Sequence, residues 1–162
     1  MALQESLAWL EAQPFATAVA ESGWLFPAIE VVHVVALTLV VGSIAMLDLR
    51  LLGVSRKDYG VLELAAQTLP WTWGAFVVAL VSGLLMFASA ATTYAANVPF
   101  RFKLVLIVLA GINMAVFHVT AYRTVHRWNH QLPTPLAARV AGTLSLAFWI
   151  GVVFLGRWIG FV

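Results

Sequence analysis

The chain has 162 residues, of which 62% are hydrophobic and only 10% are charged, and its formal net charge is +2. Soluble domains carry about 25% charged residues and about 45–50% apolar ones, so this composition is typical of an integral membrane protein. The small net charge argues against nucleic-acid binding. The absence of cysteine excludes disulfides, thiolate zinc sites, cysteine-ligated iron–sulfur clusters and covalently attached haem.

Residues 1–22 differ from the rest of the chain and are treated as a separate surface segment. The apolar Leu3, Leu7 and Leu10 are mixed with the acidic Glu5 and Glu11, and the basic start of a cleavable signal peptide is missing. The segment is too short and too polar to cross a bilayer. We expect an amphipathic helix that lies along the membrane surface.

Residues 23–162 contain four apolar stretches, and a helix needs about 20 residues to cross a hydrocarbon core of about 30 Å. The expected spans cover residues 26–52, 70–92, 100–128 and 135–158. Their apolar runs are continuous, which favours helices over barrel strands, and the short connections make neighbouring helices antiparallel. The sequence predicts an all-α integral membrane protein, an antiparallel bundle of four transmembrane helices with an N-terminal interfacial helix.

Basic residues are distributed unevenly between the two ends of this bundle. One end collects Arg50, Arg56, Lys57, Arg123, Arg127 and Arg139, and the other collects Arg101, Lys103 and Arg157. By the positive-inside rule the first end is cytoplasmic. Both termini are therefore expected on the outer, periplasmic side.

Two histidines inside the apolar stretches are the strongest indication of chemistry. His33 lies in the first span and His118 lies late in the third. Ionisable side chains at such depth are costly and usually functional, and neutral imidazole is a good ligand for haem iron. We expect haem b, with His33 and His118 as metal ligands. The alternative, that each imidazole only hydrogen-bonds a neighbouring group, stays open.

Depth decides which residues share a site with His33. His33 lies about 10 Å below the outer surface, and His118 lies about 22 Å along the third helix from Lys103, at 1.5 Å per residue. Because the two helices are antiparallel, one haem clamped between the histidines is not expected. His33 then pairs with Lys103 or Met86 at its own depth, while His118 serves a second site or a proton relay.

The remaining expected haem contacts surround these residues. Glu30 lies one turn before His33 on nearly the same helix face and is expected to hydrogen-bond its ring or a neighbouring group. Gly111 offers clearance for a flat ligand. Arg101 and Arg157, which share the outer end with Lys103, are expected to meet the propionates.

A second set of charges lies near the inner end. Asp48 and Arg50 in the first span are expected to form an ion network at the inner interface with Arg123 and Arg127 of the third.

The runs ESGWLFPAIEVVHVVALTLVVGSIAMLDLRLLG, LPWTWGAF and NVPFRFKLVLIVLAGIN resemble a family of small bacterial inner-membrane proteins of unknown function, over nearly the whole chain. This resemblance implies a topology in the bacterial inner membrane and no activity. More distantly, the first-span His and the KLVLIVL start of the third span look similar to HemJ protoporphyrinogen oxidases and CopD-like membrane domains. In HemJ proteins such a His and Lys are implicated in haem binding, which implies that role for His33 and Lys103.

The function expected from these patterns is a b-type haem protein that passes electrons within or across the inner membrane, with HemJ-like oxidation as one form. A quinone or a redox subunit is the expected partner besides the lipid bilayer. Two alternatives stay open: an auxiliary or assembly subunit of a larger complex or homo-oligomer, and a proton- or ion-conducting module built on Glu30, His33 and Asp48. The sequence assigns neither a reaction nor a substrate.

Overall fold

The structure is a computed structural model that describes residues 2–55, 58–130 and 132–161, so Arg56 and Lys57 of the expected basic end lie outside the described residues. Within these ranges all regular structure is helical. The long helices are α3 (Leu25–Leu51), α4 (Val61–Ser89), α6 (Val98–Val119) and α8 (Leu136–Trp158). The short ones are α1 (Ala2–Glu11), α2 (Pro14–Glu21), α5 (Ala91–Ala96), η1 (Ala121–Thr124), α7 (Val125–Trp128) and η2 (Ile159–Phe161).

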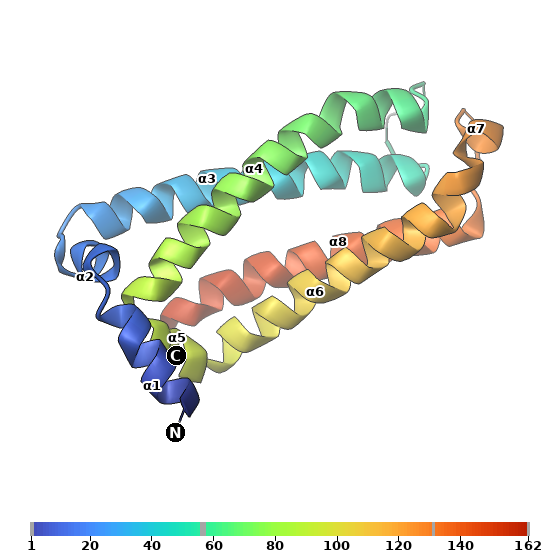
Figure 1. Cartoon of the computed structure of the whole chain (residues 1–162). Coiled ribbons are helices and arrows are strands. Elements are labelled where there is room, and N and C mark those ends of the chain that lie inside the picture. Colours follow the sequence, from blue (N-terminus) through green and yellow to red (C-terminus); the bar gives the residue numbers. More distant parts are fainter. Residues whose placement is uncertain (1, 56–57, 131, 162) are drawn as a thin grey trace.

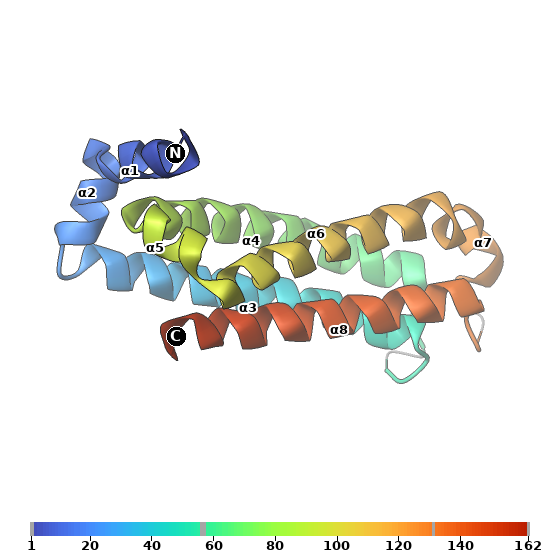
Figure 2. The ribbon, with the colours of Figure 1, turned by 90° about the horizontal axis from the view of Figure 1, so that it is seen from below.

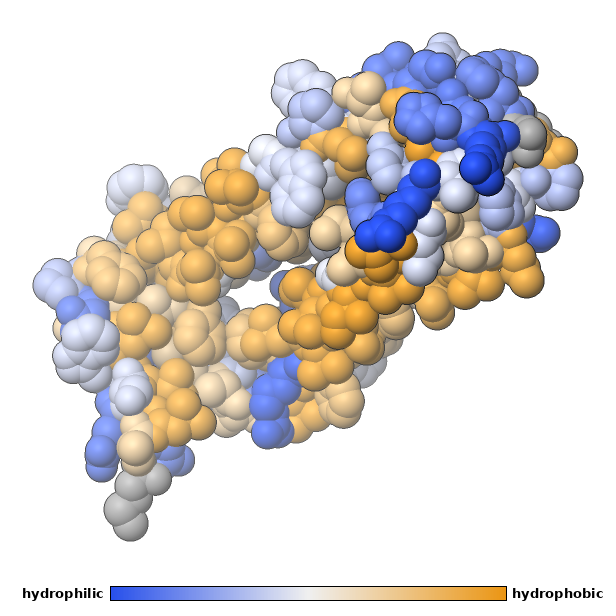
Figure 3. All heavy atoms as spheres, turned by 45° about the vertical axis from the view of Figure 1, so that its right-hand side comes forward, coloured by the Kyte–Doolittle hydropathy of each residue, from blue (hydrophilic) through white to orange (hydrophobic). Residues whose placement is uncertain are grey.

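In the described part of the chain, four helical segments are long and apolar enough to cross a membrane, and the third of them consists of α6 together with η1 and α7. Large apolar side chains cover their outer faces; on α3, for example, Val31, Val35 and Leu39 are exposed. Polar residues gather at the end formed by α7 and the α3–α4 connection, whereas the flanks of the long helices are hydrophobic (Figure 3). An apolar belt between polar ends is the surface that a bilayer requires.

The long helices are arranged as two pairs. α3 packs along α4, α6 packs along α8, and successive helices run in opposite directions (Figure 1). The pairs meet where α3 contacts α8. In the part of the chain that the structure describes, α4 and α6 share no extensive contact. The bundle is therefore open along its α4–α6 side, and Figure 3 shows an opening between the two pairs.

The short N-terminal helices cover the end opposite to α7. α1 packs on α5 and α2 packs on α4, and both lie beside the bundle instead of continuing it (Figure 2). Glu11 at the end of α1 accepts hydrogen bonds from the backbone N–H and the hydroxyl of Thr92, both at 2.8 Å. These contacts attach the surface segment to the α4–α6 connection.

The second long helix begins earlier than expected. α4 starts at Val61 and not near Pro70, so Pro70 lies inside the helix. Its first N–H groups are capped by a distant residue: Asn129 accepts from Val61 N at 3.1 Å through its carbonyl and from Leu62 N at 2.8 Å through its side chain. A capped start lets the helix run through the proline, which membrane helices tolerate when neighbouring groups satisfy the freed backbone.

Small and aromatic residues form the core between the pairs. One cluster near the middle combines Val40, Ala75, Ala110, Trp149 and Val152. A second cluster at the α7 end combines Leu51, Val61, Ala121, Val125, Trp128 and Ala138. The alanines let the helices approach closely, as small residues do in membrane bundles.

Candidate functional site

His33 lies on α3 and faces α4. Its Nδ1 is 3.0 Å from Ser82 Oγ, and Ser82 Oγ in turn donates to the carbonyl of Val78 at 2.6 Å. A hydroxyl has one hydrogen to donate, so His33 Nδ1–H is assigned as the donor to Ser82. In that tautomer Nε2 keeps its lone pair, which is the form of histidine that binds iron.

Gly83 gives the His33 ring its space. A Cβ atom on Gly83 would lie 2.9 Å from His33 Cε1 and 3.4 Å from Nδ1. Carbon atoms of side chains do not approach so closely without movement. The position therefore requires glycine for the ring to pack on α4 as it does.

Lys103 extends from α6 toward the same region. Its charge acts electrostatically on His33, and its Nζ lies 3.4 Å from the position that a Cβ on Gly156 of α8 would take. Residues of all four long helices thus come together here. We call His33, Ser82, Gly83, Lys103 and Gly156 the His33–Lys103 site.

The other residues expected around His33 are placed near this end but do not bond to it. Glu30 is exposed, and no hydrogen bond joins it to His33. Instead, the Glu30 carboxylate acts on Tyr94 of α5, and burial together with this negative charge raises the pKa of Tyr94 above its usual value. Met86 is half-buried.

Two arginines lie on the surface at the same end. Arg101 is exposed in the first turn of α6. Arg157 is exposed in the last turn of α8, and its guanidinium carbon lies 5.2 Å from the centre of the Phe161 ring. Their charges stay at the expected membrane boundary instead of entering the bundle.

His118 lies in different surroundings from His33. Its Nδ1 is 2.8 Å from the carbonyl of Met114, and its ring centre is 5.0 Å from that of Tyr122. From Lys103 to His118 along α6 the rise is about 22 Å at 1.5 Å per residue. The structure therefore places the two histidines at separate sites. His118 lines the cavity described next, and His33 does not.

A cavity of about 210 Å³ opens between α4 and α6, and we call it the inter-hairpin cleft. Its walls are mostly apolar, with aromatic side chains from three helices: Trp73, Phe76, Phe117 and Trp149. Gly111 also lines the cleft, and nothing lies within 4 Å of the position its Cβ would occupy. The polar groups in the walls are few, and they include Ser43, Asp48, Thr72, Asn113 and Ser145.

Asp48 is the charged residue buried at the wall of this cleft. It is 5% exposed, and Ser145 of α8 donates a hydrogen bond to its carboxyl group. Its Oδ2 has no hydrogen-bond partner. Among the described residues no basic group lies within ion-pair distance of it. Sequence reasoning placed Asp48 in an ion network and missed its position in the cleft.

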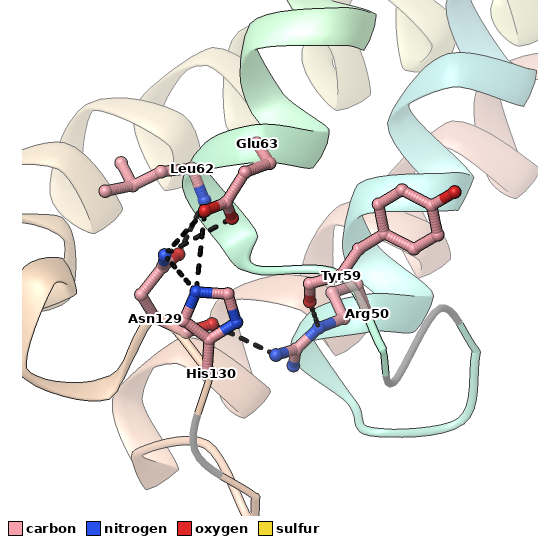
Figure 4. Close-up of polar contacts among 6 residues, drawn as sticks. All are labelled: Arg50, Tyr59, Leu62, Glu63, Asn129 and His130. Carbon is pink, nitrogen blue, oxygen red and sulfur yellow. Dashed lines mark hydrogen bonds and ion pairs between the residues drawn. The ribbon is translucent and has the colours of Figure 1, made fainter.

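Arg50, two residues further along α3, bonds to backbone oxygens instead of to acidic side chains. Its Nε donates to the Tyr59 carbonyl at 2.7 Å and its Nη2 donates to the Asn129 carbonyl at 3.0 Å (Figure 4). Arg123 and Arg127 are exposed. The expected network of Asp48, Arg50, Arg123 and Arg127 is therefore not formed. Residues two apart on a helix point to different faces, so Asp48 and Arg50 cannot share a partner set.

Asn129 is a structural residue that the sequence did not indicate as important. Besides capping α4, its amide Nδ2 lies 3.3 Å from Glu63 Oε2, and His130 Nε2 lies 3.4 Å from Glu63 Oε1 (Figure 4). Together with Arg50, these contacts fasten the α7–α8 connection to both helices of the first pair. These contacts join the helices at the α7 end, whereas among the residues that the structure describes α4 and α6 share no extensive contact along the side of the cleft.

These features define a multi-pass membrane protein of four spanning helices, with separate polar sites around His33 and Asp48. The model of a family of unknown function, DUF6644, matches residues 15–162, and the chain belongs to that family. This confirms the expected likeness to a family without assigned activity, whereas nothing found supports the expected likeness to HemJ or CopD-like proteins. No curated protein and no solved structure matches the chain.

Within the described residues, no group of three or more histidine, aspartate or glutamate side chains is placed to hold a metal ion. Haem iron needs only one or two ligands from the protein. A single histidine such as His33 or His118 would therefore be sufficient as the protein ligand of a haem.

Proposed function

We propose that the protein binds haem b at the His33–Lys103 site and passes electrons within the membrane. The observation that carries this proposal is the contact of His33 Nδ1 with Ser82 Oγ at 3.0 Å, beside an interaction of the ring with the backbone of Ala79. With Nδ1 engaged in this way, Nε2 is the nitrogen that would coordinate iron. Ligating histidines in metalloproteins usually have their other nitrogen engaged in this way. Bound haem would supply a one-electron couple at the iron.

Haem could be accommodated beside His33 only if side chains move. A Cβ on Gly83 would already lie 2.9 Å from His33 Cε1, and a Cβ on Gly156 would lie 3.4 Å from Lys103 Nζ, so the His33 ring and the Lys103 side chain would have to turn aside for a flat macrocycle. Lys103 would bind a propionate or the iron, and the exposed Arg101 and Arg157 at the same end would meet the second propionate. Lys103, Arg101 and Arg157 would thus bind or orient the haem.

The orientation proposed from charge agrees with this arrangement. Arg50, Arg123, Arg127 and Arg139 lie at the α7 end, and by the positive-inside rule that end is cytoplasmic. Both termini and the His33–Lys103 site are then on the periplasmic side of the inner membrane. α1 and α2 would lie along the outer interface as a surface segment. Electrons would be exchanged with a quinone or a redox subunit reached through the lipid.

The proposal is tested by measuring haem in purified protein. Full-length protein isolated in detergent from haem-replete cells is expected to contain about one non-covalent haem b per chain. Lys103→Met, which keeps the length and apolar packing of the side chain, is expected to lower the haem content. A wild-type preparation without haem would contradict the proposal.

A proton- or ion-conducting module is the alternative that the structure favours less. The polar side chains of α3 that face the bundle interior lie at His33 and, further along, at Ser43 and Asp48, whereas Thr38 between them is exposed and donates to the Val34 carbonyl. Buried Ala36 and Val40 lie between them. Within the described residues no hydrogen bond connects the two groups.

A further inference from the structure

We propose that the inter-hairpin cleft binds a lipid-soluble phenol, with the hydroxyl group of the ligand donating a hydrogen bond to Asp48. This site is separate from the His33–Lys103 site, since His33 and Lys103 do not line the cleft. The inference does not require haem to be bound.

The first observation is the unsatisfied acceptor. Asp48 is 5% exposed, its Oδ2 is buried without a hydrogen-bond partner, and Ser145 interacts with the carboxyl group. A buried acceptor without a donor is unfavourable, and a hydrogen bond to it from a ligand removes that penalty. The missing partner is therefore a hydrogen-bond donor.

The second observation is the chemistry of the walls. Trp73, Phe76, Phe117 and Trp149 line the cleft, and aromatic side chains pack favourably against an aromatic ring in edge-to-face or offset geometry. The other polar side chains of the walls, such as Ser43, Thr72 and Asn113, are neutral, so a charged amine would exchange most of its hydration for apolar surroundings. A neutral aromatic alcohol satisfies Asp48 without bringing a charge into the bundle.

The third observation is the route of entry. The cleft lies on the side where α4 and α6 do not pack together, and that side faces the apolar surroundings of the long helices. At the α7 end, Asn129 is hydrogen-bonded to Arg50 of α3 and to Leu62 of α4, and these contacts hold the two helices together there. A ligand therefore enters sideways from the lipid, which requires an apolar, membrane-soluble molecule.

The test uses a matched pair of probes, 4-bromophenol and 4-bromoanisole, which differ in the hydroxyl donor. Bromine quenches tryptophan fluorescence on contact, and Trp73 and Trp149 line the cleft. With full-length protein in lipid nanodiscs, 4-bromophenol is expected to quench saturably at a dissociation constant about tenfold lower than that of 4-bromoanisole, as one hydrogen bond to a carboxylate provides. Unsaturable quenching, or equal affinities for the two probes, would overturn the proposal.

Two further comparisons locate the binding. Gly111→Phe fills the cleft and is expected to remove saturable quenching. Gly42→Phe is its control, because Gly42 also has nothing within 4 Å of its Cβ position but does not line the cleft. Equal quenching by the two variants would contradict the proposed location.

Asp48→Asn tests the hydrogen-bond acceptor. In this variant 4-bromophenol and 4-bromoanisole are expected to bind with nearly equal dissociation constants, and an unchanged difference between the two would exclude Asp48 as the acceptor. The glycine pair decides the outcome if Asp48→Asn does not fold.

Discussion

Asp48 and Arg50 lie two residues apart on α3, both buried, and each keeps one polar atom without a hydrogen-bond partner. They do not neutralise each other, because a separation of two residues turns the side chains about 200° apart around the helix. Arg50 points to the α7 end and bonds to backbone carbonyls. Asp48 points to α8 and the inter-hairpin cleft. Asp48 and Arg50, which the sequence predicted to share one ion network, therefore have different roles. Arg50 joins α3 to two connections, and Asp48 lies in the wall of the cleft.

The first prediction concerns the stability cost of the Asp48 carboxyl group. Asp48→Asn keeps the shape of the side chain and removes an ionisable group that is buried without an ion-pair partner among the described residues, so the free energy of unfolding should rise by about 1 kcal/mol. Thermal unfolding of the detergent-purified protein measures this. Ser145→Ala, which removes the one donor to the carboxyl group, should lower stability by about 1 kcal/mol. A less stable Asp48→Asn protein would show that the carboxylate has a partner.

The second prediction concerns Arg50, which fastens α3 to two connections. Arg50→Ala removes the buried guanidinium that donates to the part-buried carbonyl groups of Tyr59 and Asn129, and the free energy of unfolding should fall by about 2–3 kcal/mol. The same thermal unfolding experiment applies. Arg127→Ala is the control, because Arg127 is exposed, and its effect should stay within about 0.5 kcal/mol. Similar melting temperatures for the two variants would contradict the assigned role.

The third prediction concerns Gly83 beneath the His33 ring. Gly83→Ala should displace the ring, since the added Cβ would lie 2.9 Å from Cε1, at a cost of about 1–3 kcal/mol. Gly74→Ala on the same helix meets nothing within 4 Å and should be stabilising by about 0.5–1 kcal/mol. If Gly83→Ala and Gly74→Ala change the melting temperature in the same direction, the result would contradict the close packing of His33 on α4.

The fourth prediction concerns Tyr94, whose pKa is raised by burial and by the Glu30 charge. A raised pKa means that the folded protein holds the tyrosine proton more firmly than the unfolded chain does, so stability falls as the pH rises above the usual tyrosine range. Glu30→Gln should lower the pKa of Tyr94 toward its usual value, leaving the burial effect.

Alkaline titration of tyrosinate absorbance measures this shift, with Tyr94→Phe used to assign the transition. Glu21→Gln serves as the control, because Glu21 is exposed and does not act on Tyr94. If Glu30→Gln titrates like Glu21→Gln, then Glu30 and Tyr94 are not close in solution.

Composition and hydropathy were sufficient to predict four membrane-crossing helices, because a continuous apolar run of this length has few other stable forms. The start of α4 was not predictable, since its cap comes from Asn129, far away in the sequence. Pro70 indicated the start of a helix. The observed helix begins at Val61 because Asn129, from the α7–α8 connection, caps its first N–H groups.

The candidate sites were predictable only in part. The apolar runs around His33 and His118 identified both residues as candidate ligands. The helical rise per residue was sufficient to predict that the two histidines lie at different depths in the membrane. The cleft was not predictable, because it depends on which helices do not pack together. Asp48 and Arg50 were paired by charge and proximity in sequence, but helix geometry sends their side chains to different neighbours.

The most direct test of the central proposal is a reduced-minus-oxidised absorption spectrum of the purified protein with His33→Ala and His118→Ala as a matched pair. We expect b-type haem bands in the wild type and in His118→Ala, and their loss in His33→Ala. A wild-type protein without these bands, or a His33→Ala protein that keeps them unchanged, would contradict the assignment of His33 as the haem ligand.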